Sequence, residues 1–186
     1  MRTGGHGGAV LCGGRSERFG RDKALIDYDG RPLAERVATV LEAAGCSPVV
    51  FVGGDGVGLM AATGREFVAD TQPGEGPLGG VVEALRRFQS GEGDVDGVVV
   101  AACDLPNLTA SAVRAVASGA TPACAAADRL HPGLAYWPIA EADHVAALFS
   151  AGMRSLHEAL DALGATRVPV EEVEMHNVNR PSDLRH

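Results

Sequence analysis

Hydrophobic residues form short continuous runs that alternate along the chain with segments of helical periodicity. Continuous runs without alternating polar residues are typical of strands that are covered on both faces of a sheet. These runs occupy residues 9–12, 49–52, 67–69 and 97–103. Between and after them, apolar residues recur at helical spacing over 33–44, 78–88 and 110–118. The strand–helix order predicts an α/β fold with an open, mainly parallel central sheet and helices on both faces.

The second half of the chain is less regular. The elements expected here are a strand over 123–127, a turn over 128–133, a strand over 134–137 and a short strand near 167–170. Two helix starts are clearer, because Thr109 is a good N-cap and Ser155 forms a capping box with Glu158. A tail over 176–186 ends the sequence, and no repeat or linker divides it. We therefore expect one domain over residues 1–186.

Composition narrows the class of protein. The sequence has a formal net charge of −8, with 46% hydrophobic and 22% charged residues, which is typical of a globular chain. A net-acidic chain repels a phosphate backbone, so nucleic-acid binding is not expected. Neither a membrane-spanning stretch nor the apolar core of a signal peptide is visible, so we expect no membrane and a cytoplasmic location. Four widely spaced cysteines, expected to be buried free thiols, agree with a reducing compartment: Cys12, Cys46, Cys103 and Cys124.

A glycine-rich, basic segment over residues 11–25 follows the first strand directly. Its glycines let successive backbone N–H groups form an anion nest. Three arginines accompany Lys23, which is the single lysine among 16 Lys and Arg residues. The P-loop pattern and the dinucleotide pattern G-x-G-x-x-G are both absent. The segment predicts a phosphate-binding loop, and a solvated basic loop with two turn glycines is the alternative.

The same segment carries a specific resemblance. Its pattern Leu-x-Gly-Gly-x-Ser-x-Arg-x-Gly-x-Asp-Lys-x-Leu resembles the signature of NTP-dependent nucleotidyltransferases. It is most similar to the molybdenum cofactor guanylyltransferases, which join GMP from GTP to molybdopterin and release pyrophosphate. The resemblance covers nearly the whole chain. It implies a three-layer, Rossmann-like nucleotidyltransferase fold, with a nucleotide-binding half over about 1–107 and an acceptor-binding half over about 108–186.

Two later motifs fit the nucleotide side. Asp70 follows the third strand, and Gly76-Pro77-Leu78 opens the next helix. The resemblance implies that this region lies beside the nucleotide, and a guanine edge suits a carboxylate acceptor. Asp104 follows the strongest strand, at the edge where such sheets bind ligands. Mg²⁺ takes one or two carboxylates plus substrate phosphates, and the resemblance assigns the metal to Asp104. The alternative for the Gly76-Pro77-Leu78 region is an ordinary helix-entry turn, and the alternative for Asp104 is a cap for the turn that follows it.

A third motif fits the acceptor side. His176-Asn177-Val178-Asn179-Arg180-Pro181-Ser182-Asp183 matches the family pattern Asn-x-Asn-x-Pro-x-Asp. Alternating positions of an extended segment share a face, so both asparagine amides can face one ligand. The resemblance implies that they face molybdopterin. His131-Pro132-Gly133 also resembles a family His-Pro turn, although ordinary turn chemistry is the simpler interpretation of His131.

The sequence departs from the family at two points. Cys12 stands where alanine is usual, which changes little because a backbone contact suffices there. The family also has an asparagine at the end of the second strand, where this chain has none. A backbone group of Gly53 or Gly54, or the Asp55 side chain, could replace it.

The resemblance thus predicts a GMP transfer from GTP to molybdopterin, with Mg²⁺ as cofactor and in-line attack on the α-phosphorus. The catalytic residues expected are Arg18, Lys23 and Asp104, and the metal ligand expected is Asp104. The nucleotide-binding residues expected are Leu11, Cys12, Gly13, Gly14, Lys23, Asp70, Gly76, Pro77, Leu78 and Asp104, and the acceptor-binding residues are Asn177 and Asn179. Transient contact with cofactor-biosynthesis proteins or molybdoenzymes is expected.

Three alternatives stay open. The chain could use CTP on the same cofactor. It could activate a sugar phosphate or a phospholactate. It could also be a nucleotide- or cofactor-binding module without turnover.

Overall fold

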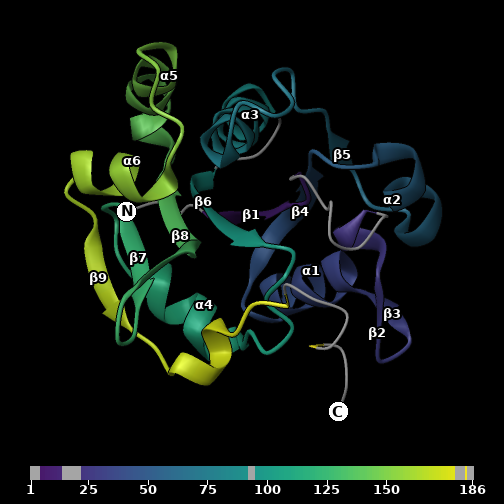
Figure 1. Ribbon diagram of the computed structural model, residues 1–186. Coiled ribbons are helices and arrows are strands. Elements are labelled where there is room, and N and C mark those ends of the chain that lie inside the picture. Colours follow the sequence, from purple (N-terminus) through teal and green to yellow (C-terminus); the bar gives the residue numbers. More distant parts are fainter. Residues whose placement is uncertain (1–4, 14–21, 92–94, 179–182, 184–186) are drawn as a thin grey trace.

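The protein is built around a seven-stranded sheet with the strand order β5-β4-β1-β6-β8-β7-β9 (Figure 1). The structure is a computed structural model that describes residues 5–13, 22–91, 95–178 and 183. The strands are β1 (Gly5–Leu11), β4 (Cys46–Val52), β5 (Phe67–Val68), β6 (Val95–Ala102), β7 (Ala123–Ala126), β8 (Leu130–Pro138) and β9 (Thr166–Pro169). β8 runs antiparallel to β6 and β7, whereas the other pairings in this sheet are parallel. The predicted mainly parallel sheet is confirmed.

Helices cover both faces of the sheet, which confirms the three-layer arrangement (Figure 1). The helices are α1 (Leu33–Ala43), α2 (Gly56–Thr63), α3 (Pro77–Ser90), α4 (Ala110–Val116), α5 (Ala142–Ser150) and α6 (Leu156–Ala162). α1 and α4 pack on one face, against Val10 and Val99, and α3, α5 and α6 pack on the other, against Ala9 and Val100. Because successive strand residues point to opposite faces, a continuous apolar run fills two cores at once.

Short elements complete the fold. A hairpin of β2 (Asp27–Tyr28) and β3 (Arg31–Pro32) precedes α1. The 3₁₀ turn η1 (Lys23–Leu25) comes directly before this hairpin, and η2 (Ile139–Glu141) and η3 (Glu172–Met175) lie in the second half of the chain. Within the described ranges, no helix combines the length and the apolar composition needed to cross a membrane.

The N-caps predicted at Thr109 and Ser155 are present, but of the predicted capping box the described residues form only the Ser155 half. The Thr109 hydroxyl accepts a hydrogen bond from the Ala112 N–H at the start of α4. Ser155 accepts one from the Glu158 N–H at the start of α6. Each cap satisfies one of the N–H groups that a helix start leaves without an intrahelical partner.

Other expectations were wrong or incomplete. The turn predicted over 128–133 is shorter, because β8 already begins at Leu130, where it pairs with Ala126 of β7. α2 and α5 were not predicted. α2 has no apolar stripe to reveal it, since Leu59 is the one buried residue among its eight.

Candidate active site

The carboxyl ends of three parallel strands meet at one edge of the sheet. β1 continues into Cys12, whose N–H donates to the Val52 carbonyl on β4 at 2.8 Å. β6 continues into Cys103, whose N–H donates to the Leu11 carbonyl at 3.1 Å. The loops that follow β1, β4 and β6 therefore start side by side. This is the edge at which open α/β sheets bind ligands.

An ion pair between Lys23 and Asp104 lies at this edge. The Lys23 Nζ is 2.7 Å from the Asp104 Oδ2, and each side chain is only 16% exposed. Lys23 begins η1, and Asp22 caps that turn by accepting from the Ala24 N–H at 2.9 Å. The second Asp22 oxygen accepts from the Asp55 N–H at 2.6 Å. Asp22 thus ties the Lys23 segment to the loop after β4.

The C-terminal segment reaches the same carboxylate. The Asn177 Nδ2 donates to the Asp104 Oδ1 at 3.0 Å, and the Val178 N–H donates to the Asp104 carbonyl at 3.0 Å. The first and last segments of the fold therefore converge on the loop after β6.

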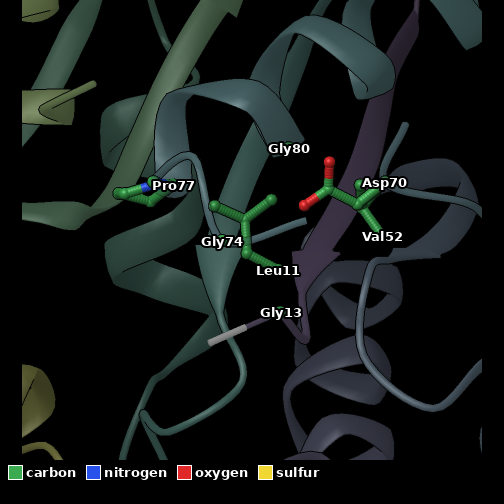
Figure 2. A pocket seen from close by; sticks show the side chains of 8 residues that line it. Leu11, Gly13, Val52, Asp70, Gly74, Pro77 and Gly80 are labelled. Carbon is green, nitrogen blue, oxygen red and sulfur yellow. The ribbon is translucent and has the colours of Figure 1, made fainter. Parts of the chain in front are cut away.

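A cavity of about 280 Å³ lies beside Gly13, between the end of β1 and the start of α3 (Figure 2). Its lining consists of Leu11, Gly13, Val52, Asp70, Gly74, Gly76, Pro77 and Gly80. The Asp70 carboxylate points into it, while its Oδ1 accepts from the Gln72 N–H at 2.9 Å. Aliphatic walls, glycine backbone and one carboxylate suit a flat ligand with hydrogen-bond donors on its edge. Asp70 also borders a wider hollow of about 750 Å³ on the side of α2.

Glycines allow the loops after β1 and β4 to touch. At Gly54, φ is +82°, and an added Cβ would lie 2.8 Å from the Cys12 carbonyl oxygen and 2.9 Å from the Asp22 Oδ2. A side chain at this position would therefore push the glycine-rich loop away.

The groups that could replace the family asparagine are partly engaged. The Gly53 N–H donates to the Val68 carbonyl, and the Asp55 carboxylate caps α2 by accepting from the Gly58 N–H at 3.1 Å. Asp55 is thus held at the helix start.

A third cavity, of about 260 Å³, lies between the loop after β6, the start of β8 and the C-terminal segment. It is lined by Leu105, Arg129, Leu130, His131, Pro132, Gly133 and Asn177. His131 belongs to β8 rather than to the expected turn, is 6% exposed, and its Nε2 lies 2.9 Å from the Glu172 Oε2. Asn177 stands between this cavity and Asp104.

The structure places the expected site residues differently. Lys23, Asp104 and Asn177 contact one another in a chain, and Leu11, Gly13, Asp70, Gly76 and Pro77 line the 280 Å³ cavity. Leu78 is fully buried in the core, and its N–H donates to the Arg154 carbonyl at 3.3 Å. Gly14, Arg18 and Asn179 lie outside the described residues.

The Cys12 thiol is buried, and the Cys12 backbone N–H bonds to the Val52 carbonyl. Burial raises the pKa of this thiol well above the ordinary value, so the side chain stays protonated beside Cys103. Both are free and buried, as are Cys46 and Cys124, which confirms the expectation of buried thiols.

Sequence reasoning missed the roles of Asp22 and Gly80. Asp22 could have been found, because an aspartate just before a short helical turn is a typical N-cap. Gly80 packs closely against Leu11 in the wall of the cavity, because an added Cβ would lie 3.0 Å from the Leu11 Cδ2. This contact has no local signal in the sequence.

The carboxylate at the ligand-binding edge suits a cation that is bound partly by the protein and partly by the substrate. Among the described residues, no three His, Cys, Asp or Glu side chains gather into a metal cage. Mg²⁺ rarely needs such a cage, because it keeps waters and binds one or two carboxylates together with phosphate oxygens. Asp104 supplies one carboxylate at the ligand-binding edge, so the residues present suit a divalent ion held jointly with phosphates.

A mainly parallel, three-layer α/β fold that brings Lys23 and Asp104 together at the carboxyl edge of its sheet is typical of nucleotidyltransferases. The chain belongs to the family described as "MobA-like NTP transferase domain", whose profile matches residues 8–167.

Named relatives agree with this assignment. The chain is 36% identical to a probable molybdenum cofactor guanylyltransferase of Deinococcus radiodurans, over 95% of this chain and 90% of that protein. It is 33% identical to a molybdenum cofactor guanylyltransferase of Xanthomonas euvesicatoria, over 94% and 89%. Among solved structures, molybdopterin-guanine dinucleotide biosynthesis protein A from Archaeoglobus fulgidus matches with a TM-score of 0.76 and 27% identity, covering 95% of this chain and 94% of that one.

Proposed function

We propose that this protein transfers GMP from GTP to molybdopterin, forming the guanine dinucleotide cofactor and releasing pyrophosphate. The observation that carries the proposal is the Lys23–Asp104 pair, which lies at the ligand-binding edge of a MobA-like fold. The names of the relatives give the substrates. The cavity beside Gly13 offers room for a nucleotide, and the cavity beside Asn177 offers room for an acceptor.

The nucleotide is bound by the N-terminal half, over about residues 1–107. The backbone of the loop after β1 holds the phosphates, and Asp70 accepts from the donor edge of guanine. The residues that we assign to this end are Leu11, Cys12, Gly13, Gly14, Lys23, Asp70, Gly76, Pro77, Leu78 and Asp104. The choice of GTP over CTP is supported by the Asp70 carboxylate in the cavity, because guanine presents two adjacent donors.

The reaction is an in-line displacement. A phosphate oxygen of molybdopterin forms a bond to the α-phosphorus, the bond from this phosphorus to the bridging oxygen breaks, and pyrophosphate leaves with the electron pair. The nucleophile is already an anion, so no strong base is needed, and catalysis consists of positioning and charge neutralisation. Lys23 offers a compact charge to the triphosphate, and Arg18 neutralises charge on the leaving group.

Asp104 is the residue that would hold Mg²⁺, together with phosphate oxygens. When bound, Mg²⁺ would neutralise the charge that keeps two phosphorylated substrates apart. Lys23 and Asn177 hold the two oxygens of the Asp104 carboxylate, which keeps this group oriented toward the edge.

The acceptor is bound by the second half, over about residues 108–186. Asn177 and Asn179 are assigned to it, and Asn177 borders the 260 Å³ cavity.

We also propose that the enzyme works in the cytoplasm, makes transient contacts with cofactor-biosynthesis proteins or molybdoenzymes, and binds neither nucleic acid nor membrane.

The decisive experiment is release of pyrophosphate from purified protein with Mg²⁺, molybdopterin and each of GTP, CTP, ATP and UTP. We expect release with GTP that depends on molybdopterin. Release with CTP alone would move the protein to the cytidylyl branch. Binding of GTP without release by any nucleotide would support a binding module instead, and release with a sugar phosphate as acceptor would replace molybdopterin.

A further inference from the structure

The Asp104 carboxylate is bound at both oxygens by segments that lie far from it in sequence. Lys23 donates to Oδ2 at 2.7 Å, and Asn177 donates to Oδ1 at 3.0 Å. We propose that Asn177 is a positioning residue that orients Asp104 for the divalent cation, beyond any contact that it makes with the acceptor. The proposal rests on the proposed function, because it gives Asn177 a role toward the metal-binding carboxylate of that reaction.

The Asn177 amide is held firmly in place. The next residue, Val178, donates its N–H to the Asp104 carbonyl and is 0% exposed, in a cluster with Ile26, Tyr28 and Leu33. Met175, two residues earlier, is 1% exposed in the main core. Because both flanks are anchored, the amide reaches Asp104 from a fixed backbone rather than from a loose tail.

The bond from Asn177 orients the Asp104 carboxylate and does not neutralise its charge. Lys23 already supplies a positive charge, whereas an amide N–H is neutral and directional. A carboxylate with one oxygen held by a fixed donor loses less rotational freedom when a cation binds, which favours binding. Outer partners of a metal ligand commonly change metal affinity by about 10–100-fold when they are removed.

Asn177 lies next to both Asp104 and the 260 Å³ cavity. Its amide donates one N–H to Asp104, and the same residue lines the 260 Å³ cavity. An amide carries a second N–H and a carbonyl oxygen besides this donor. The acceptor assignment and the positioning role are therefore compatible, because the bond to Asp104 uses only one of the polar groups of this side chain.

A simpler role would be a tether for the C-terminal segment. The chain offers a matched control for it, since the Asn107 Nδ2 donates to the Val173 carbonyl at 3.3 Å. This bond also links the region after β6 to the C-terminal segment, but it does not touch Asp104. Loss of a tether alone should act in the same way at Asn107 and at Asn177.

The test is Mn²⁺ binding, followed by electron paramagnetic resonance, to the complex with a GTP analogue whose α,β-bridging oxygen is replaced by a methylene group. No acceptor is present, so the readout is independent of turnover. The variants are Asn177→Ala, Asn177→Leu, which keeps the bulk of the side chain, and Asn107→Ala. Thermal melting is measured on the same samples.

We expect both Asn177 variants to bind Mn²⁺ about tenfold more weakly, with affinity for the analogue in the absence of metal unchanged, and Asn107→Ala to bind it like the wild type. Wild-type Mn²⁺ affinity in a folded Asn177 variant would overturn the proposal, as would equal weakening in all three variants. If the wild type bound neither the analogue nor Mn²⁺, the proposed function would fail together with this inference. If the wild type bound both and the Asn177 variants bound Mn²⁺ equally well, only this inference would be overturned.

Discussion

Lys23 and Asp104 are 81 residues apart in the chain, yet their charged atoms lie 2.7 Å apart at the edge of the sheet. The pair forms because β1 and β6 are adjacent parallel strands, so that the segments after them leave the sheet on the same side. In the free protein each group neutralises the other. When substrate binds, phosphates can replace Asp104 as the partner of Lys23, and a cation can replace Lys23 as the partner of Asp104. Neither charge is then left buried without a partner.

Replacement of Lys23 by alanine should lower turnover at least tenfold, which corresponds to about 1.4 kcal/mol of transition-state stabilisation. Lys23→Arg should restore only part of the rate, because a planar guanidinium does not replace a compact ammonium. Pyrophosphate release measures both variants. An alanine variant with the wild-type rate would remove Lys23 from the mechanism.

The base preference depends on Asp70. We expect GTP to bind more tightly than CTP, ATP or UTP, and Asp70→Ala to reduce this preference, since a neutral, short side chain cannot accept from guanine. Isothermal titration with the four nucleotides measures the effect. A clear preference of the wild-type protein for CTP would contradict the assignment of Asp70 to guanine.

Gly54 should be intolerant of a side chain because of what surrounds it. Gly54→Ala places a Cβ 2.8 Å from the Cys12 carbonyl oxygen, and we expect GTP affinity to fall at least tenfold as the loop after β1 shifts. Gly64→Ala is the matched control, because φ is also positive there, at +70°, but no atom lies within 4 Å. It should cost about 1 kcal/mol of stability and leave GTP affinity intact. Equal GTP affinity in the two variants would show that the contact is unimportant.

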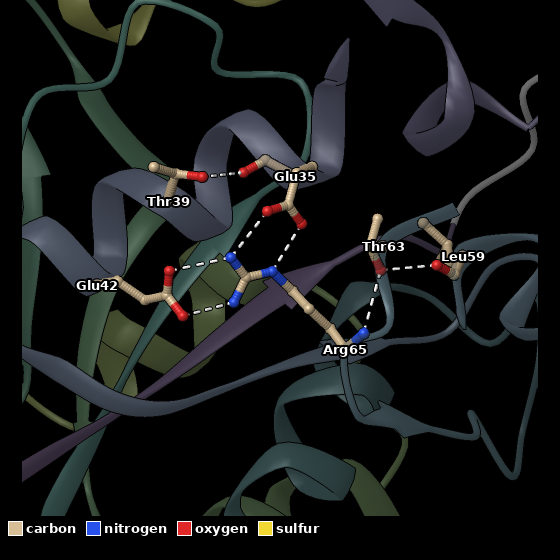
Figure 3. A network of polar contacts seen from close by, with 6 residues as sticks. All are labelled: Glu35, Thr39, Glu42, Leu59, Thr63 and Arg65. Carbon is tan, nitrogen blue, oxygen red and sulfur yellow. Dashed lines mark hydrogen bonds and ion pairs between the residues drawn. The ribbon is translucent and has the colours of Figure 1, made fainter. Parts of the chain in front are cut away.

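Arg65 joins the start of β5 to α1 by donating to both Glu35 and Glu42 at 2.6–2.9 Å (Figure 3). Hydrogen bonding from Arg65 lowers the pKa of Glu42 from its ordinary value of about 4.5. A carboxyl group with a lowered pKa stabilises the folded state at pH values above its ordinary pKa. This contribution is lost as the pH falls through the pKa of the folded state. Glu42→Gln should therefore destabilise at pH 7, by less than about 1 kcal/mol for so exposed a pair, and the destabilisation should shrink steadily as the pH is lowered below about 4.5.

Urea unfolding at several pH values measures this difference. The control is the same substitution in an Arg65→Met background, where it should have no effect at any pH, because the partner is missing. A Glu42→Gln effect that does not shrink as the pH falls, or that survives the loss of Arg65, would exclude this pair as its source.

The four thiols should be unreactive in the folded protein. Burial raises the pKa of Cys46 and of Cys124 to about 11, and the thiolate is the reactive form. A thiol reagent at pH 8 should label the native protein slowly and all four cysteines rapidly in guanidinium chloride. Rapid labelling of one thiol in the native state would show that its site opens.

The sequence by itself determined the features that depend on near neighbours. The apolar runs predicted the central strands because burial on both faces leaves no room for polar alternation. The N-caps at Thr109 and Ser155 were predictable because each bond spans three residues. The glycine-rich loop and Asp104 could likewise be placed at the ligand-binding edge, since each directly follows a recognisable strand.

Only the tertiary structure decided the features that depend on distant parts of the chain. The antiparallel insertion of β8 moved His131 from a turn into a strand, where it meets Glu172, 41 residues away. α2 became a helix without an amphipathic pattern to predict it. Asn177 bonds to Asp104 across 73 residues because the C-terminal segment packs against the start of the fold. Such contacts follow from the order of strands and the packing of layers, and neither is encoded in the spacing of neighbouring residues.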